Sequence, residues 1–213
     1  MSTDQLVSIE TVDITGLNTK VIKSLDSTQL SSLTTEQMSV MYTNQIGAIN
    51  TKFFGNLTTE QIVGLSAKQF AALNKNQVGQ MDSGQLGAIE TDDIASIKTA
   101  GLVKLTSQTL NGLTTEQVAA LTGTQLSKLT TFQFSSLNTE QISAIETKDI
   151  SSLGTKQIKT LSSMQVSSLG AEQISAMGTK HIKALTTTGL DGLSTTQMSA
   201  ITSVQIKVLT TKQ

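Results

Sequence analysis

Apolar side chains recur along this chain at two fixed places of an eight-residue repeat. When the octad is written as positions a to h starting at Met1, position a is Met, Ile or Leu in every copy from Met1 to Leu209. Position f is also apolar in every copy, from Leu6 to Ile206. The apolar spacing therefore alternates between five and three residues without any insertion. We expect a repeat protein, because a fixed short period is the signature of repeat architectures.

This spacing excludes two simple backbones. A β-strand places residues two apart on one face, so positions a and f would point to opposite faces. One continuous α-helix advances by about 100° per residue, so its apolar stripe would drift by about 80° per octad and soon wrap around the whole cylinder. A short helix that restarts in every octad fits the pattern better.

Polar residues at positions b and e carry the signals for a helix start. Position b is Ser, Thr, Asn, Asp or Gly in 22 of 27 copies, and position e is Gln in 18 of 27. A polar cap with Gln three residues later forms a capping box, and apolar residues at N′ and N4 form a hydrophobic staple five residues apart. In Leu113–Ala120 the box is Thr114 with Gln117, and the staple is Leu113 with Val118. We predict helices of six or seven residues, each followed by a corner between positions a and b.

A single octad cannot be stable alone, because an isolated two-turn helix is marginal in water. Neighbouring coils must therefore stack along a common axis, with the a and f side chains as the core. The sequence predicts an all-α solenoid of about 26 octads, with residues 1–213 as one continuous repeat array. The terminal octads are no more polar than the interior ones. The array is therefore either a piece of a longer one, or it self-associates through uncapped ends at Met1 and Gln213.

Composition removes several classes of function. The chain has 15 Lys and no Arg against 16 acidic residues, with five Phe, one Tyr and no Trp. Nucleic-acid binding is not expected, since it needs clustered positive charge and stacking surfaces. No apolar run approaches the length of a membrane span, so membrane insertion is not expected, and no basic-then-apolar signal peptide opens the chain. Cysteine is absent, which excludes disulfides and thiolate metal sites.

The candidate chemical groups are few. His181, the one histidine, stands at position e, and we interpret it as a replacement for the capping Gln, because no nucleophile or orienting acid accompanies it. We interpret the Glu–Asp pairs as helix-capping carboxylates, since calcium requires six to eight oxygens. These pairs are Glu10 with Asp13, Glu90 with Asp93, and Glu146 with Asp149. No catalytic, cofactor-binding or metal-binding residue is assigned, no cofactor is expected, and we do not expect an enzyme.

The remaining octad positions are expected to form the surface, apart from the Phe and Met residues. Position d mixes Lys with Glu and is expected to face solvent; its Lys residues are Lys20, Lys52, Lys68, Lys148, Lys156, Lys180 and Lys212. The recurring Thr at position c could match an ice lattice, but a helix-starting role bonded to the backbone is the simpler interpretation. Phe and Met fall almost entirely at positions a and f, which assigns them to the core. Phe53 and Phe132 are exceptions, and we expect both to be exposed as a candidate contact patch.

The Leu-Thr-Thr-x-Gln-Ile/Val unit, as in Leu113–Ala120 and Leu137–Ala144, resembles octad arrays of very long bacterial secreted or surface proteins of the adhesin-like and haem-utilisation type. The resemblance implies an extracellular or cell-surface stalk. Haem binding is not expected, because His181 is the one imidazole and no Cys is present. We expect a structural repeat scaffold, stalk or spacer. The alternatives are a filament subunit that stacks end to end and a protein-binding solenoid module.

Overall fold

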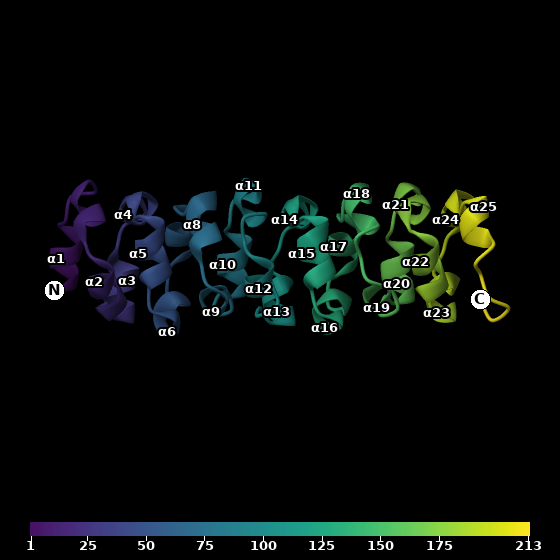
Figure 1. Cartoon of the computed structure of the whole chain (residues 1–213), viewed down its shortest axis with the longest axis horizontal. Coiled ribbons are helices and arrows are strands. Elements are labelled where there is room, and N and C mark those ends of the chain that lie inside the picture. The colour runs from purple at the N-terminus through teal and green to yellow at the C-terminus, as the bar shows by residue number, and fades with distance from the viewer. The chain divides into compact units, whose positions relative to one another are not determined.

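The computed structural model describes residues 1–213 and is all-helical (Figure 1). It contains 25 α-helices of four to six residues, one short 3-10 helix and no strand. The predicted all-α class and the repetition of short helices are confirmed. The chain divides into two compact units, residues 1–112 and 113–213, which are described separately.

The first unit holds thirteen α-helices and the 3-10 helix. They are α1 (Thr3–Val7), η1 (Asp13–Gly16), α2 (Thr19–Ser24), α3 (Ser27–Ser32), α4 (Thr35–Val40), α5 (Thr43–Ala48), α6 (Thr51–Phe54), α7 (Thr59–Val63), α8 (Ala67–Ala72), α9 (Lys75–Val78), α10 (Ser83–Gly87), α11 (Thr91–Ile94), α12 (Thr99–Leu102) and α13 (Ser107–Leu110).

The second unit holds twelve α-helices. They are α14 (Thr115–Ala120), α15 (Gly123–Lys128), α16 (Thr131–Ser135), α17 (Thr139–Ser143), α18 (Thr147–Ile150), α19 (Thr155–Ile158), α20 (Ser163–Ser167), α21 (Ala171–Ala176), α22 (Thr179–Ala184), α23 (Thr187–Asp191), α24 (Thr195–Ala200) and α25 (Ser203–Ile206).

The predicted capping box starts most of these helices. At α4, the Thr34 hydroxyl accepts the Gln37 backbone N–H at 3.1 Å, and the Gln37 side-chain oxygen accepts the Thr34 N–H at 3.0 Å. The same reciprocal pair, with a polar side chain at position b, opens α3, α7, α14 and α24. Because the first N–H groups of a helix have no partner within the helix, this box satisfies donors that would otherwise be lost.

Two extended residues make the corner between octads. After α3, Leu33 has a ψ of 137° and Thr34 a ψ of 161°. No residue of the chain has a positive φ, so the corner needs no glycine. The predicted place of the corner is confirmed. The predicted length of six or seven residues is wrong for most helices, which have four or five residues and end at position f or g.

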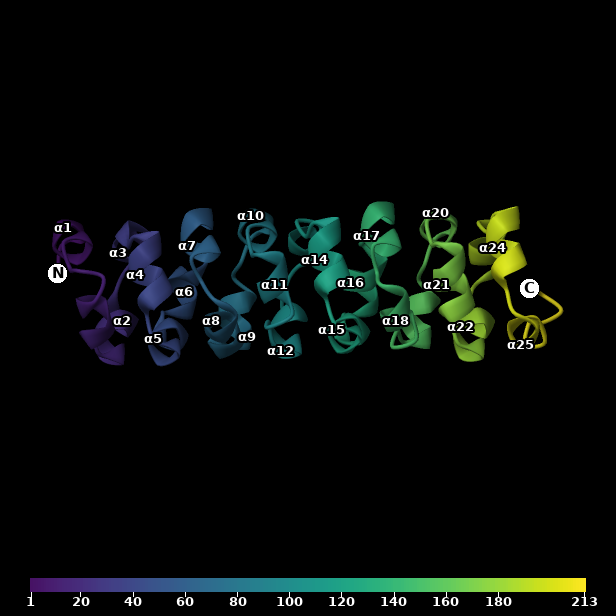
Figure 2. The same ribbon diagram turned by 90° about the horizontal axis from the view of Figure 1, so that it is seen from above.

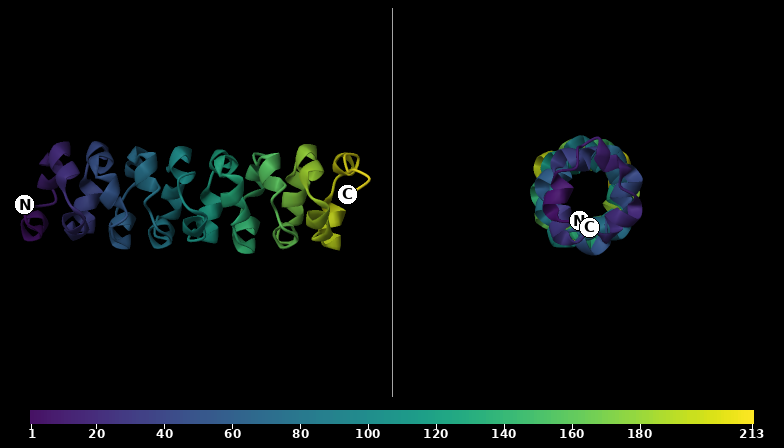
Figure 3. Two further views of the ribbon diagram at one scale, coloured as in Figure 1. Left: turned by 90° about the horizontal axis from the view of Figure 1, so that it is seen from below. Right: turned by 90° about the vertical axis from the view of Figure 1, so that its left-hand side faces the viewer.

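Within each unit the helices wind so that a helix packs against the third helix further along. The pairs α2 with α5, α5 with α8 and α9 with α12 pack in the first unit, and α18 with α21 and α21 with α24 pack in the second. The successive turns of each unit can be followed in Figures 2 and 3. Residues three octads apart in the sequence therefore become neighbours in space.

Positions a and f fill the inside of the coil, as predicted. In the interior turns Phe54 at position f is fully buried, and Leu57 at position a is 3 % exposed. The first and last turns differ from each other in a regular way. In the first turn Met1 at position a is 54 % exposed while Leu6 at position f is buried. In the last turn Ile206 at position f is 47 % exposed. Position a therefore faces the preceding turn, and position f faces the following one.

Candidate functional site

The chain's main buried polar site is position e, where a single side chain joins two turns of the coil. Gln77 is fully buried, and its side-chain oxygen accepts the Asn74 N–H of its own helix at 2.9 Å. Its side-chain nitrogen donates to the carbonyls of Ile46 at 3.0 Å and Ile49 at 2.9 Å in the preceding turn. One amide therefore caps the start of α9 and also binds the end of α5, whose last carbonyls lack partners within that helix.

This arrangement repeats in both units. The amide at position e donates to carbonyls that lie 31 residues back, at position f, and 28 residues back, at position a. Both bonds are formed by Gln37, Gln45, Gln61, Gln69, Gln77, Gln157, Gln197, Gln205 and Gln213. The bridge reaches position f of the helix four octads earlier and the corner three octads earlier. One turn of the coil therefore takes between three and four octads.

Sequence reasoning assigned this Gln only to the capping box of its own helix. The second half of its role was missed, because an eight-residue period does not reveal which earlier octad lies beneath a given one. A signal was nevertheless present. Glu also completes a capping box, yet position e contains no Glu in any copy. A carboxylate would point its charge at two carbonyl oxygens, whereas an amide offers them hydrogens.

His181 takes the same place with an imidazole. It is fully buried; its Nδ1 accepts the Gly178 N–H at 3.1 Å, and its Nε2 lies 2.8 Å from the Leu153 carbonyl oxygen. Nε2 therefore carries the proton and donates it to Leu153. Burial lowers the pKa of His181 below its ordinary value, the bond to Leu153 raises it, and the charge of Lys180 lowers it. The predicted replacement of the capping Gln is confirmed, and the imidazole also bridges two turns.

Asp at position e reverses the direction of the bridge. The Oδ1 of Asp149 accepts the N–H of Gly123, the first residue of α15, at 2.8 Å. Its Oδ2 is buried without a hydrogen-bond partner. Asp93 likewise accepts the backbone N–H of Ala67, the first residue of α8; its pKa is raised by burial and by Glu90 despite that bond. A carboxylate can only accept, so it binds a helix start rather than a helix end.

The interpretation of the Glu–Asp pairs as capping carboxylates is therefore wrong in its detail. Glu90 and Glu146 occupy the N-cap positions of α11 and α18, but neither side chain accepts a cap hydrogen bond. Glu146 instead pairs with Lys148 at the surface. The Glu side chain is one methylene longer than Asp, and the short Asp, Asn, Ser and Thr side chains are the ones that reach back as caps.

Two short residues at position e, Gly101 and Thr109, cannot form the full bridge. A Cβ added to Gly101 would lie 2.8 Å from the Cβ of Val78, so the Val side chain packs directly against this glycine. Thr109 is polar but shorter than Gln, and its hydroxyl donates to the Met81 carbonyl, 28 residues back, at 3.5 Å.

The exposed surface agrees with most of the predictions for it. The Lys residues at position d are all exposed, and position c supplies the first residue of each α-helix. Phe132 is 75 % exposed, as predicted. Phe53 is half-buried rather than exposed, with the Lys52 nitrogen 5.5 Å from its ring centre. Met164, assigned to the core with the other Met residues, stands at position d and is 69 % exposed.

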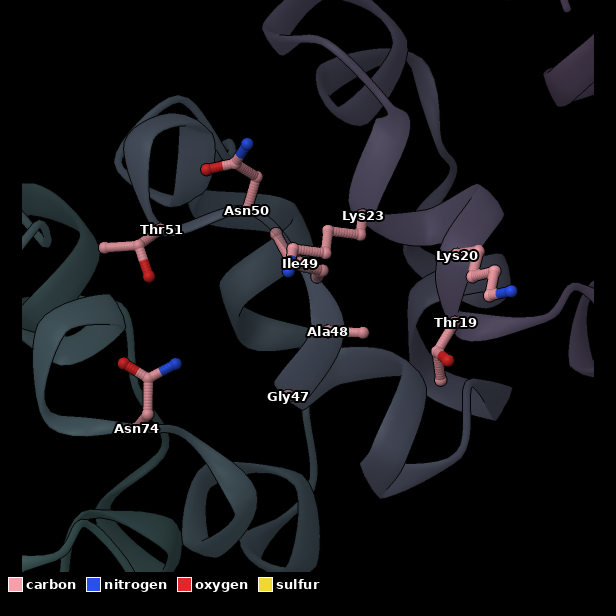
Figure 4. Close-up of a pocket in the computed structure, with 9 residues that line it drawn as sticks. All are labelled: Thr19, Lys20, Lys23, Gly47, Ala48, Ile49, Asn50, Thr51 and Asn74. Atoms are coloured by element: carbon pink, nitrogen blue, oxygen red, sulfur yellow. The ribbon is translucent and has the colours of Figure 1, made fainter.

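Two surface hollows bring charged side chains together, one beside α2 and one lined by Glu146, Lys148 and Glu172. The hollow beside α2 has a volume of about 440 Å³, and its lining includes Lys20, Lys23, Asn50 and Asn74, which Figure 4 labels. No carboxylate or imidazole lines it. No group of three or more His, Cys, Asp or Glu side chains lies together anywhere in the chain in a way that could hold a metal ion. The helices are all too short to cross a membrane.

Comparison with known proteins identifies the repeat. No curated protein matches the chain. A family model described as the ALTTAQ repeat matches residues 6–43, 86–123, 142–179 and 174–211. This agrees with the Leu-Thr-Thr-x-Gln octads, and the four matches together cover more than half of the sequence. The chain therefore belongs to the ALTTAQ repeat family.

Proposed function

We propose that the chain is a structural repeat module, one solenoid that serves as a scaffold, stalk or spacer. The observation that carries this proposal is the hydrogen bonding of the buried polar side chains that recur at position e. In octad after octad the Gln at position e is hydrogen-bonded to the backbone of its own helix and to the backbone of the preceding turn. A Gln bonded in this way has both ends of its amide engaged, so it stabilises the coil and does not offer these atoms to a substrate. We accordingly propose no catalytic role.

The continuity of the octads supports a single solenoid. The pattern of positions a, e and f runs without insertion through the whole sequence, and each unit repeats the same bridge at the same offsets. In such a nearest-neighbour architecture, length is added by adding octads, because each turn needs only the turns on either side. Such a module can hold two other parts of a protein at a distance that the number of octads sets.

Small-angle X-ray scattering of the 213-residue chain tests the scaffold proposal. A solenoid predicts a rod-like profile with a constant cross-section, and a variant with seven additional octads inserted after Gly112 should lengthen the rod without changing that cross-section. A compact particle, or a cross-section that grows with the insertion, would contradict the proposal. A stoichiometric protein partner recovered with the chain would favour the binding-module alternative instead.

We also propose that the module belongs to a bacterial surface or secreted protein. The support is the resemblance of the octads to arrays of large bacterial surface proteins. Brief trypsin treatment of intact cells that produce the protein tests this location, since the Lys side chains at position d are exposed and cleavable. Peptides released before lysis, without peptides of a cytoplasmic control protein, would support it. Release only after lysis would refute it.

A further inference from the structure

The second unit carries lysines on helices that pack in series. α19 packs against α16, and α22 packs against α19, so the three helices lie in successive turns of the coil (Figure 1). α19 presents Lys156 at position d and, at its C-cap, Lys159 at position g, while α22 presents Lys180 and Lys183 at the same two positions. All four side chains are exposed, and we call them the lysine strip. Residues three apart on a helix lie side by side, so each of the two helices offers a pair of ammonium groups.

No carboxylate neutralises the lysine strip. The helices α16, α19 and α22 contain no Asp or Glu, and the acidic residues of the second unit stand on other helices or at their caps. The chain's one salt bridge joins Lys148 to Glu146, so none of the four lysines of the strip is held in an ion pair. The strip is therefore a local excess of positive charge on a chain whose net charge is -1.

An exposed aromatic side chain lies at one end of the lysine strip. Phe132 stands at position d of α16, the position that Lys156 occupies on α19, and it is 75 % exposed. Its neighbour Thr131 lines a hollow of about 380 Å³ together with Lys156. The ring therefore adjoins the α19 pair of lysines, at a place where a partner can bury apolar surface.

We propose that the lysine strip and Phe132 together bind an extended acidic segment of another protein. Packed helices lie about 8–10 Å apart, and an extended chain rises about 3.3 Å per residue. Acidic side chains at every third residue of such a segment therefore meet one lysine pair per helix. An apolar residue about three positions further along meets Phe132, which fixes the end of the segment that lies over α16.

The chemistry of this surface favours an acidic peptide over a phosphate polymer or a membrane. All its cations are Lys, and the chain has no Arg to bind phosphate in a bidentate way. One ring offers no series of stacking surfaces for bases, and it adds little apolar area for entry into a bilayer. The lysine pairs follow successive turns of the coil, which suits a linear segment that runs across those turns.

This inference goes beyond the scaffold role and does not depend on it. A rod that lengthens with added octads but binds no acidic segment would support the scaffold and refute the docking of the segment. A compact particle that binds the segment through the lysine strip would refute the scaffold alone.

Fluorescence anisotropy with a labelled synthetic peptide tests the proposal on the full chain. The peptide carries fluorescein, has Glu at every third position with Ser and Thr between, and has Leu at both ends. The control peptide has Gln in place of every Glu. We expect the Glu peptide to bind on the order of tenfold tighter than the Gln peptide, because only the carboxylates complement the lysine strip. Equal binding of the two peptides would overturn the proposal, and this comparison needs no variant of the protein.

Charge reversal locates the binding on the lysine strip. The variant that combines Lys156→Glu, Lys159→Glu, Lys180→Glu and Lys183→Glu should bind the Glu peptide on the order of tenfold more weakly or worse, because four attractions become repulsions. Phe132→Ser should weaken binding by about threefold, through the loss of the apolar contact alone. Binding that is unchanged in both variants would overturn the proposal.

A matched variant separates the lysine strip from the net charge of the chain. It combines Lys20→Glu, Lys52→Glu, Lys68→Glu and Lys98→Glu, which are exposed, stand in four separate octads of the first unit and change the net charge by the same amount. At an ionic strength of about 0.15 M it should bind the Glu peptide within about twofold of the wild type, because distant charges are screened. An equal loss in the two charge-reversal variants would overturn the proposal.

Anionic lipid vesicles and a short DNA strand are the competing probes. Vesicles of phosphatidylserine with phosphatidylcholine, and a single strand of twelve nucleotides, are offered to the wild-type chain under the same conditions. We expect the Glu peptide to bind and both of these probes to bind more weakly. Binding of the vesicles or the DNA without binding of the Glu peptide would assign the lysine strip to a lipid or a nucleic acid and overturn the proposal.

Discussion

Acidification should weaken the coil at His181, and His181→Gln should remove this sensitivity. The imidazole is fully buried, with Nδ1 accepting the Gly178 N–H at 3.1 Å and Nε2 donating to the Leu153 carbonyl at 2.8 Å. Protonation of Nδ1 would set two N–H groups against each other and place a charge in the core. Gln, the usual residue at this position, makes both bonds without titrating.

The size of this loss of stability follows from the difference in proton binding between the folded and unfolded chains. The folded pKa of His181 is lowered from its ordinary value of 6.5, chiefly by burial. Well above pH 6.5 the His181 imidazole is neutral in both the folded and the unfolded chain, so it causes no pH-dependent loss of stability. Below it the unfolded chain binds a proton that the folded chain does not. Stability then falls by up to about 1.4 kcal/mol per pH unit, until the pH reaches the folded pKa.

Urea unfolding of the wild-type chain and the His181→Gln variant between pH 4.5 and 8 measures this difference. The carboxylates, including Asp93 with its raised pKa, are common to both proteins, so subtracting the two profiles isolates the imidazole. The wild type should lose stability relative to the variant as the pH falls below about 6.5. Parallel profiles throughout this range, or a wild type that gains stability on acidification, would refute the assigned bonds.

Three further variants test the bridges and the close approach of the turns. Gln77→Ala removes two bonds to the preceding turn and should cost about 2–4 kcal/mol in urea unfolding, whereas Gln5→Ala loses only a cap and should cost about 1 kcal/mol. Similar losses for both would show that the bridge contributes nothing. Asp149→Asn removes a buried charge whose Oδ2 has no partner and keeps an oxygen for the Gly123 N–H, so thermal unfolding at pH 7 should show unchanged or higher stability; a clear loss would mean that the carboxylate is needed. Gly55→Ala would place a Cβ 2.6 Å from the Gln80 carbonyl oxygen and should cost about 1–3 kcal/mol, while Gly16→Ala meets open space and should be neutral; equal melting temperatures would argue against this packing.

The sequence by itself determined the local structure of this protein. The residues at b and e predicted where each helix begins, and the spacing of a and f predicted the core, because capping and stapling act within six consecutive residues. The place of the corner between Leu33 and Thr34 followed from the same pattern. The helix length was overestimated, because no signal in the octad marks the end of the helix at position f or g.

Only the tertiary structure decided what position e does. The partners of Gln77 lie 28 and 31 residues away, and the number of octads per turn, which brings them together, depends on how whole turns pack. The same packing decides that Asp149 binds a helix start and that His181 is fully buried. These contacts join distant segments, and an eight-residue repeat looks the same whichever earlier octad lies beneath it. A local pattern therefore fixes the helices, while the contacts between turns fix the bridge.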